Sequence, residues 1–408
     1  MEKCMNHGLI STVKEEVAHR LDLSRDFSDD EIIDVITEVV FERSQASYID
    51  LKQKKAIIET IFNSMRRLDI IQPLLEDESI TEIMVNNYNE VFIERNGIIH
   101  QMDIGFESNE RLINVIQSIV AKVNRSVNEA SPIVDARLPD GSRVNVVLPP
   151  VALKGPTMTI RKFPEDALTI KKLIEYGALN EGSASLLEKL VRSKYNIFVS
   201  GGTGSGKTTF LNALSNYIPP GERVITIEDS AELQLKNIRN LIRLETRNPN
   251  TEGKGEITIR DLIKASLRMR PDRIIVGEVR GAEALDMLQA MNTGHEGSLS
   301  TGHANATKDM LSRLETMVLS GAMFPVEVIR KQIASAIDII IHLARLRDGS
   351  RKVMEIAEVV GYRGGEVSIS PLYLFQEDGE ADDHRVLGTL KKINELTHTV
   401  KMKMSGLI

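Results

Sequence analysis

The chain has 408 residues, more than the roughly 250 to 300 at which a single hydrophobic core stops growing, so two or more domains are expected. Its 42% hydrophobic and 27% charged residues exclude a low-complexity or fibrous protein, and the net charge of -7 argues against a general nucleic-acid binder. The single Cys4 excludes an internal disulfide and a four-cysteine zinc cluster. No apolar run approaches the roughly 18 residues of a membrane helix, and the first residues lack a signal-peptide block, so we expect a cytoplasmic protein.

Residues 1–70 carry helical periodicity. In EIIDVITEVVFER the apolar residues fall on one face, and a second segment repeats this pattern with Ile57, Ile61 and Phe62. These stripes are typical of packing faces rather than cofactor contacts. We therefore expect a helical bundle or docking module that carries no chemistry.

Residues 71–162 change to short strands. The segment VFIERNGIIHQM predicts a hairpin turning at Asn96-Gly97, and RLPDGSRVNVVLPP predicts another at its Asp-Gly pair. Between them, RLINVIQSIVAKV is an amphipathic helix, which makes this a mixed α/β domain. Pro164, in FPEDALTIKK, indicates an interdomain linker over 163–172.

Residues 173–408 alternate apolar strands with helices. The strands are NIFVS, RVITI, RIIVG, GSLST and AIDIIIHL. Strands of this kind, separated by helices, indicate a parallel sheet that is covered on both faces. The fold class is therefore α/β.

The most specific motif is GGTGSGKTT, which follows the first of these strands and precedes a helix. In such a loop, consecutive backbone N–H groups surround a phosphate, Lys207 neutralises the β- and γ-phosphate oxygens, and Thr208 ligates Mg²⁺. A flexible glycine-rich turn is the alternative interpretation. The predicted nucleotide-binding residues are Gly201, Gly202, Thr203, Gly204, Ser205, Gly206, Lys207, Thr208 and Thr209.

Three other strands end in polar residues. Glu228-Asp229 follow RVITI, Glu278 follows RIIVG, and His303 ends GSLSTGH. Because ligands bind outside the carboxyl ends of parallel strands, these groups and the glycine-rich loop should share one edge. Glu278 can hold the water shell of Mg²⁺ or accept a proton from attacking water, although an ion pair with Arg280 is the alternative. Glu228 can orient water or the metal.

For His303 and for three arginines in residues 71–162, the sequence allows two interpretations each. His303 is either a structural hydrogen-bonding residue or a sensor of the γ-phosphate that affects the following helix. Arg137, Arg143 and Arg161 occupy predicted strands, from which a guanidinium can reach nucleotide phosphates, or they are surface arginines.

Taken together, GGTGSGKTT, ITIEDSAEL, RIIVGEVRG and STGHAN resemble the type II/type IV secretion ATPase superfamily. The segments VDARLPDGSRVNVVLPP and GPTMTIRKF are similar to those of the branch that serves tight-adherence (Flp, type IVc) pili. This resemblance covers roughly residues 75–375. A cysteine zinc module, present in many type II members, is missing here.

The resemblance implies a RecA-like P-loop C-terminal domain, a smaller mixed α/β N-terminal domain and a homo-hexameric ring that hydrolyses ATP. By motif, Glu278 is the Walker B glutamate, Glu228 is the acidic residue of the aspartate box, and His303 is the histidine-box residue. Together with Lys207 these are the expected catalytic residues. Arg143 and Arg161 match arginines that contact the nucleotide, and Gly302, where relatives carry a bulky residue, is expected to loosen the backbone at His303.

The function that this resemblance implies is an ATPase at the cytoplasmic face of the inner membrane, which powers assembly, and retraction where it occurs, of a tight-adherence pilus or secretion system. Its partners are platform proteins of the membrane. The alternatives are a type IV secretion ATPase for DNA or effector transfer and a nucleotide-binding scaffold without hydrolysis. A RecA-like helicase is disfavoured because Trp is absent and aromatic residues make up only 4% of the chain.

Overall fold

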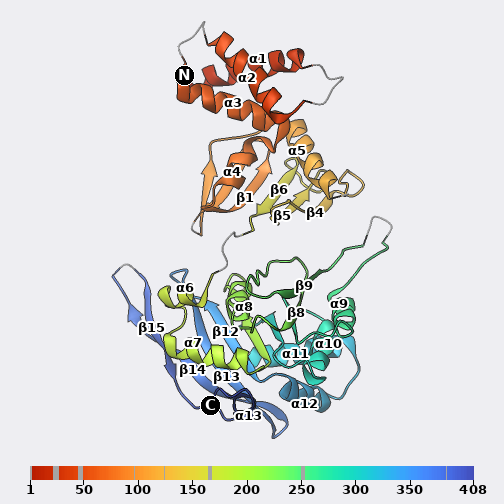
Figure 1. Ribbon diagram of the computed structural model, residues 1–408, viewed down its shortest axis with the longest axis vertical. Helices are drawn as coiled ribbons and strands as arrows, with labels where there is room; N and C mark the ends of the chain where they lie inside the picture. The colour runs from red at the N-terminus through yellow and green to blue at the C-terminus, as the bar shows by residue number, and fades with distance from the viewer. Residues whose placement is uncertain are drawn as a thin grey trace. The chain divides into compact units, whose positions relative to one another are not determined.

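The computed structural model describes residues 2–21, 27–44, 49–95, 97–123, 125–163, 168–249, 253–382 and 384–408. The chain forms two compact units, Met1–Glu165 and Asp166–Ile408 (Figure 1). Pro164, on which the expected linker was based, lies outside the described residues. None of the described helices combines the length and apolar character needed to span a bilayer.

The first unit begins with three helices around a small core of their own. They are α1 (Glu2–Arg20), α2 (Asp29–Arg43) and α3 (Leu51–Arg66). Ile36 and Ile61 are fully buried where the apolar stripes of α2 and α3 meet, as the periodicity predicted. Ser28 and Asp50 each form a capping box, which fixes where α2 and α3 begin.

The rest of the first unit is an antiparallel sheet packed against one helix. A short 3₁₀ turn (Asp69–Ile71) and α4 (Gln72–Glu76) lead into it. Its strands follow the order β3-β2-β1-β6-β5-β4. Both predicted hairpins form, as β2–β3 and β4–β5, although Asn96 lies outside the described residues. The bounds are β1 (Ile80–Asn87), β2 (Glu90–Arg95), β3 (Ile98–Met102), α5 (Asn109–Lys122), β4 (Ile133–Arg137), β5 (Arg143–Val147) and β6 (Thr157–Arg161).

The second unit contains a nine-stranded sheet in the order β15-β14-β13-β12-β7-β11-β10-β8-β9. Figure 1 shows β14 and β15 towards one edge and β8 and β9 towards the other. The bounds are β7 (Ile197–Gly201), β8 (Arg223–Glu228), β9 (Asn240–Glu245), β10 (Arg273–Val276), β11 (Leu299–His303), β12 (Ile339–Arg345), β13 (Arg351–Arg363), β14 (Glu366–Glu380) and β15 (Val386–Lys392).

This sheet is mixed, which corrects the expectation of a parallel sheet. The strands from β12 to β9 run parallel, but β12, β13, β14 and β15 pair antiparallel through successive hairpins. The antiparallel strands were not predicted because they are longer and more polar than the buried parallel strands, with many half-exposed residues.

Helices cover both faces of the parallel strands, as predicted. In β7, Ile197 and Val199 belong to one hydrophobic core and Phe198 to the other. This alternation follows from the twofold side-chain period of a strand. The helices are α6 (Ile170–Glu175), α7 (Glu181–Arg192), α8 (Lys207–Ser215), α9 (Ile259–Ser266), α10 (Glu283–Asn292), α11 (Thr307–Gly321), α12 (Val326–Ala336) and α13 (Val400–Met404).

The amino-terminal ends of the central strands are joined by side-chain hydrogen bonds to the main chain. Asn196, which is buried, accepts from the N–H groups of Gly297 and Ser298 at 2.8 and 3.1 Å, and donates to the carbonyl of Ala336 at 2.7 Å. Asp338 accepts from the N–H of Asn196 at 2.7 Å. These bonds satisfy polar groups that would otherwise be buried without partners where β7, β11 and β12 begin.

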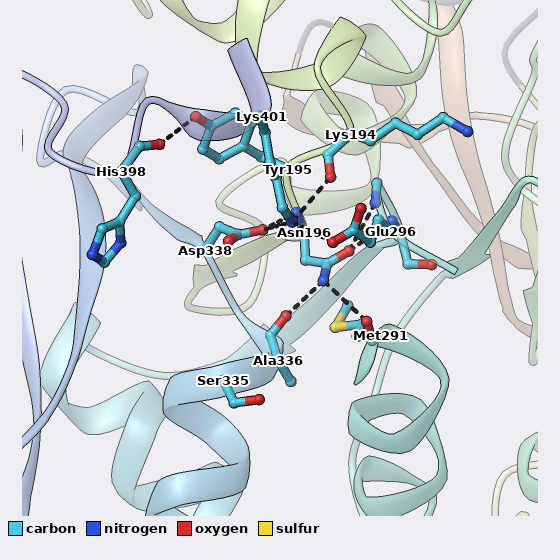
Figure 2. Close-up of polar contacts among 12 residues, drawn as sticks. Lys194, Tyr195, Asn196, Met291, Glu296, Ser335, Ala336, Asp338, His398 and Lys401 are labelled. Carbon is cyan, nitrogen blue, oxygen red and sulfur yellow. Dashed lines mark hydrogen bonds and ion pairs between the residues drawn. The ribbon is translucent and has the colours of Figure 1, made fainter. Parts of the chain in front are cut away.

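The C-terminal segment is attached to the same edge (Figure 2). Lys401 donates to Asp338 at 2.7 Å, and Tyr195 donates to the carbonyl of His398. Ser405 contacts Ser193 at 2.7 Å. The C-terminal helix α13 is therefore fixed to the start of β7 and β12.

Replacing Asp338 by alanine should destabilise the protein, because the Asn196 N–H and the Lys401 ammonium lose a common acceptor. We expect a loss of about 1 to 3 kcal/mol in the free energy of unfolding, measured by urea titration with far-UV circular dichroism. The matched control is Lys392→Met, which removes an exposed ion pair with Glu395 and should cost less than about 1 kcal/mol. Equal urea midpoints for both variants would contradict the assignment.

Candidate nucleotide-binding site

The glycine-rich motif forms a tight loop between β7 and α8, here called the phosphate loop (residues 201–208). Gly204 and Gly206 have φ of +71° and +89°, the left-handed region that favours glycine. At Gly201, an added Cβ would lie 2.5 Å from both the Leu343 carbonyl oxygen and the Ser205 hydroxyl. The loop therefore requires glycine for backbone conformation at two positions and for close packing at another.

Lys207 is buried and its ammonium is held by the loop itself. Its Nζ donates to the carbonyls of Gly201 and Gly202 at 3.2 and 2.9 Å, and lies 3.3 Å from Nδ1 of His303. Burial lowers the pKa of Lys207, while the charge of Glu278 acts in the opposite direction. The ammonium is thus positioned inside the loop, with oxygen partners that a phosphate could replace.

The strand ends bring His303 and Glu278 next to this lysine. In the sheet, His303 is the register partner of Gly201, and its Nε2 lies 2.8 Å from Oε1 of Glu278. Burial, and then the charge of Lys207, lower the pKa of His303. A neutral ring can accept from Lys207 at Nδ1, while Oε1 of Glu278 lies close to Nε2 but has no hydrogen-bond partner in the described chain. Lys207, His303 and Glu278 therefore form one series, and their expected convergence at one edge of the sheet is observed.

The ion pair proposed as the alternative interpretation of Glu278 is also present. Arg280 Nη2 lies 2.6 Å from Oε2 of Glu278. The Arg280 side chain is 66% exposed, so this pair contributes little to stability and can exchange with water. The contact with His303 and the contact with Arg280 use different oxygens, so neither excludes the other.

Glu228 is more deeply buried than Glu278. Its Oε2 accepts from the N–H groups of Glu232 and Leu233 at 2.7 and 3.0 Å, while Oε1 has no hydrogen-bond partner within the described residues. Burial raises the pKa of Glu228, against the effect of these two hydrogen bonds. An added Cβ on Gly277 would lie 2.9 Å from Cγ of Glu228, so the residue before Glu278 must be small.

The described residues fit a nucleotide triphosphate with Mg²⁺. The first turn of α8 leaves main-chain N–H groups unpaired, as helix N-termini do, and its N-cap is Gly206, which has no side chain to satisfy them. The unpartnered Oε1 of Glu228 and the hydroxyl of Thr208 are oxygens of the kind that Mg²⁺ and its water shell prefer. The main-chain N–H donors therefore suit the phosphates of ATP, and the oxygen acceptors suit Mg²⁺, which are the two cofactors predicted from the sequence.

Comparison with known proteins identifies the family. Residues 65–391 match the sequence profile of the family described as "Type II/IV secretion system protein". The chain belongs to this family. Helices α1 and α2 and most of α3 precede the matched region.

Two relatives agree with this assignment. A Mycobacterium tuberculosis protein named for conjugal transfer is 34% identical over 328 residues, covering 79% of this chain and 92% of its own. The type IV secretion system protein VirB11 of Brucella suis is 32% identical over 318 residues, covering 71% of this chain and 88% of its own.

A solved structure supports the fold. The pilus retraction motor PilT with bound ADP has a TM-score of 0.53 at 22% identity, covering 83% of this chain and 86% of its own. At this identity the likeness concerns the fold alone. The α/β fold with a RecA-like P-loop domain is therefore confirmed.

Gly302 does not loosen the backbone of this family member, contrary to the expectation. It lies inside β11, where its register partner is Ser200. An added Cβ would lie 2.9 Å from the ring of Phe198 and 3.0 Å from Cε of Met310. Its small size allows α11 and β7 to pack closely around the strand that ends at His303.

The three arginines predicted to reach nucleotide phosphates lie in one row across β4, β5 and β6. Arg137 pairs in register with Arg143, and Arg143 pairs with Arg161. Glu82 follows in the row, 3.8 Å from Arg161. Like charges directly opposite one another are unfavourable in a sheet, and the carboxylate of Glu82 partly balances the row.

The hairpin of β12 and β13, which was not predicted from the sequence, contacts the phosphate loop from outside. The Leu343 carbonyl lies against Gly201, and Arg351 Nε donates to the carbonyl of Gly204 at 2.8 Å. His342 contacts Ser200, the residue before the loop, at 3.2 Å. The segment RLRDGSR carries an Asp-Gly turn signal, but its position beside the loop follows from sheet order, which periodicity does not give.

Replacing Gly201 by alanine should weaken nucleotide binding by about tenfold or more, because the new methyl group would displace the Leu343 carbonyl or the Ser205 hydroxyl. Binding of a fluorescent ATP analogue measures this effect. Gly221→Ala is the control, since an added Cβ there meets nothing within 4 Å. A folded Gly201→Ala protein with normal affinity would show that this close packing is not needed.

Proposed function

We propose that this protein is an ATP hydrolase whose nucleotide cycle drives assembly of a tight-adherence pilus or related secretion system. The observation that carries the proposal is the series Lys207, His303 and Glu278 at the end of the phosphate loop. It provides a cation for the triphosphate, a carboxylate for water or metal, and a ring that contacts both. Neither a flexible loop nor a surface ion pair accounts for this arrangement.

The roles follow from the contacts. Lys207 and the loop N–H groups bind the β- and γ-phosphates, with Thr203, Ser205 and Thr209 around them. Thr208 and Glu278 hold Mg²⁺, in part through water, and the metal when bound neutralises charge between these phosphates. Glu278 accepts the proton of the attacking water.

Glu228 and His303 have supporting roles in this proposal. Glu228 orients water or metal from its buried position. His303 responds to the presence of the γ-phosphate through its contact with Lys207. Arg143 and Arg161, with their forked and permanently charged groups, contact the nucleotide from the first unit.

The proposal includes a homo-hexameric ring at the cytoplasmic face of the inner membrane, acting on platform proteins. Support for the ring comes from family membership alone. The domain limits are proposed as predicted: a helical extension over 1–70, the smaller domain over 71–162, a linker over 163–172 and the ATPase domain over 173–408.

A type IV secretion ATPase for DNA or effector transfer is the second candidate. The relatives named for conjugal transfer and type IV secretion favour it. Genes beside the coding gene distinguish the two: pilin, prepilin peptidase and platform genes support the pilus, and conjugation genes support transfer. In either case, contact with nucleic acid by this chain itself is not expected.

Replacing Glu278 by glutamine should abolish turnover while ATP binding is retained, because the amide cannot accept the proton. We expect kcat to fall by about 100-fold or more, measured by phosphate release, with unchanged affinity for an ATP analogue. Lys207→Ala is the matched control, since it should lose affinity as well. Normal turnover by the glutamine variant would remove the role of Glu278, and a wild-type protein without phosphate release would favour the scaffold.

The purified protein should have the mass of six copies of the chain in the presence of a non-hydrolysable ATP analogue and Mg²⁺. Without the analogue, we expect either the same mass or that of a smaller species that assembles when the analogue is added. Light scattering after size exclusion measures this mass. The Lys207→Ala protein, which should lose nucleotide affinity, shows whether assembly of the ring requires bound nucleotide. A monomer under all conditions would contradict the ring.

A further inference from the structure

A small cavity lies beside the phosphate loop, on the side of β12. Its volume is about 210 Å³, and its lining includes Gly202 and Thr203 of the loop, Asn305 after β11, and His342 and Arg345 of β12. No carboxylate is among the described residues that line it. Because a water molecule takes up about 30 Å³ of the liquid, this volume is sufficient for a small tetrahedral anion.

The cavity is next to the position expected for the γ-phosphate. Lys207, which is proposed to bind the β- and γ-phosphates, donates to the Gly202 carbonyl at 2.9 Å and lies 3.3 Å from His303. Gly202 also lines the cavity, and Asn305 of its lining follows His303 by two residues. The phosphate that hydrolysis removes is therefore formed beside this cavity.

Arg345 brings to the cavity a positive charge that no described acidic residue neutralises. The segment RLRDGSR, over residues 345–351, contains three arginines. Arg347 pairs with Glu377 and Glu380 at 2.7 and 3.0 Å. Arg345 forms neither a hydrogen bond nor an ion pair within the described part of the chain. Its guanidinium is thus available for a ligand.

The aspartate of the same segment is already occupied. Asp348 Oδ1 accepts from the N–H and the hydroxyl of Ser350 at 2.9 and 2.7 Å. Its Oδ2 accepts from the N–H of Val386 at 2.8 Å. These contacts fix the turn between β12 and β13, so Asp348 does not serve as the partner of Arg345.

Arg351 adds a second charge beside the phosphate loop. It is the register partner of Arg345, and it has no acidic partner among the described residues. Its Nε donates to the Gly204 carbonyl at 2.8 Å, which places it against the loop. Like charges directly opposite one another are unfavourable in a sheet. Unlike the arginine row of the first unit, to which Glu82 contributes a carboxylate, this pair has no described acid beside it, so an anion would stabilise it.

We propose that this cavity is a binding subsite for orthophosphate, the second product of ATP hydrolysis, and that Arg345 is its main cation. This inference rests on the proposed function. In the reaction, the oxygen of water bonds to the γ-phosphorus, the bond from that phosphorus to the oxygen retained by ADP breaks, and the proton of water passes to Glu278. The orthophosphate formed then enters the cavity, where the forked guanidinium of Arg345 fits its oxygens and the Thr203 hydroxyl and Asn305 amide donate to it.

A phosphate in this subsite and a phosphate in the loop depend on different residues. The terminal phosphate of ATP is bound by Lys207 and the main-chain N–H groups of the loop. Orthophosphate in the cavity is bound by Arg345. Substitution of Arg345 should therefore weaken binding of orthophosphate without weakening binding of the triphosphate.

The first test measures binding of orthophosphate to the full chain saturated with ADP and Mg²⁺, from the ³¹P NMR line width. Arg345→Gln should raise the Kd for orthophosphate by about tenfold or more, with unchanged affinity for a fluorescent ATP analogue. Arg345→Lys keeps the charge but not the fork and should give an intermediate Kd. Since Arg345 is exposed, both changes should leave the fold intact. The matched control is Arg363→Gln, which replaces an exposed arginine at the other end of β13 from Arg351 and should change neither affinity.

The second test places the subsite in the reaction. In a single turnover of the wild type, phosphate should appear in solution later than ATP is cleaved, as measured with a fluorescent phosphate sensor and with acid-quenched samples. Arg345→Gln should shorten this delay, because the product is held less tightly. A site that only takes up free phosphate from solution gives no delay.

The inference is overturned if Arg345→Gln binds orthophosphate as the wild type does, or if its affinity for the ATP analogue falls in parallel. It is also overturned if Arg363→Gln weakens orthophosphate binding equally, or if the wild type shows no delay. A wild type that does not cleave ATP would reject the proposed function and the inference together. Cleavage of ATP combined with orthophosphate binding that does not depend on Arg345 rejects the inference alone.

Discussion

The burial of the Lys207 ammonium is the constraint on which the site depends. A cation placed inside the fold must be given oxygen or nitrogen partners, because its desolvation is otherwise too costly. Here the loop carbonyls of Gly201 and Gly202 and the ring of His303 supply them. These partners need the left-handed glycines of the loop and a histidine at the end of the neighbouring strand, so one buried charge constrains the residues of the loop and of the adjacent strand end.

Polar side chains at the two edges of the central sheet differ in how fully their hydrogen bonds are satisfied. At the amino-terminal edge, Asn196 and Asp338 hydrogen-bond to main-chain groups, and the buried Arg273 pairs with Glu222 and with the Val191 carbonyl. At the carboxyl edge, the Lys207 ammonium has one acceptor for each of its three N–H groups, but one oxygen of Glu228 and one oxygen of Glu278 have no hydrogen-bond partner in the described chain. Satisfied polar groups favour a single arrangement, whereas incompletely satisfied ones favour binding of a ligand.

Local sequence patterns predicted much of the fold, because the periodicity of strands and helices and the spacing of turn glycines depend on residues that are close in the chain. The strand–loop–helix around Lys207 and the burial of both faces of β7 follow from periodicity and glycine spacing. The convergence of Glu228, Glu278 and His303 followed from one rule about strand ends. The antiparallel strands β13–β15 were missed because they are long and polar, and the contacts of His342 and Arg351 were missed because they depend on the position of β12 beside β7. Gly302 was misjudged for the same reason: its small size matters only where Phe198 and Met310 approach it.

The two acids of the site differ in a way that supports separate tasks. Glu228 receives two backbone hydrogen bonds and is 3% exposed, so its position is fixed and burial raises its pKa. Glu278 is hydrogen-bonded through Oε2 to the exposed Arg280, while its Oε1 lies 2.8 Å from Nε2 of His303 without a hydrogen bond in the described chain, so its contacts are all with side chains. A proton acceptor must release its existing contacts when water and nucleotide arrive, whereas an orienting group must not move. Under the proposed function, these environments suit Glu278 to proton transfer and Glu228 to orientation, and the 2.8 Å contact with His303 places Glu278 next to a ring that also contacts Lys207.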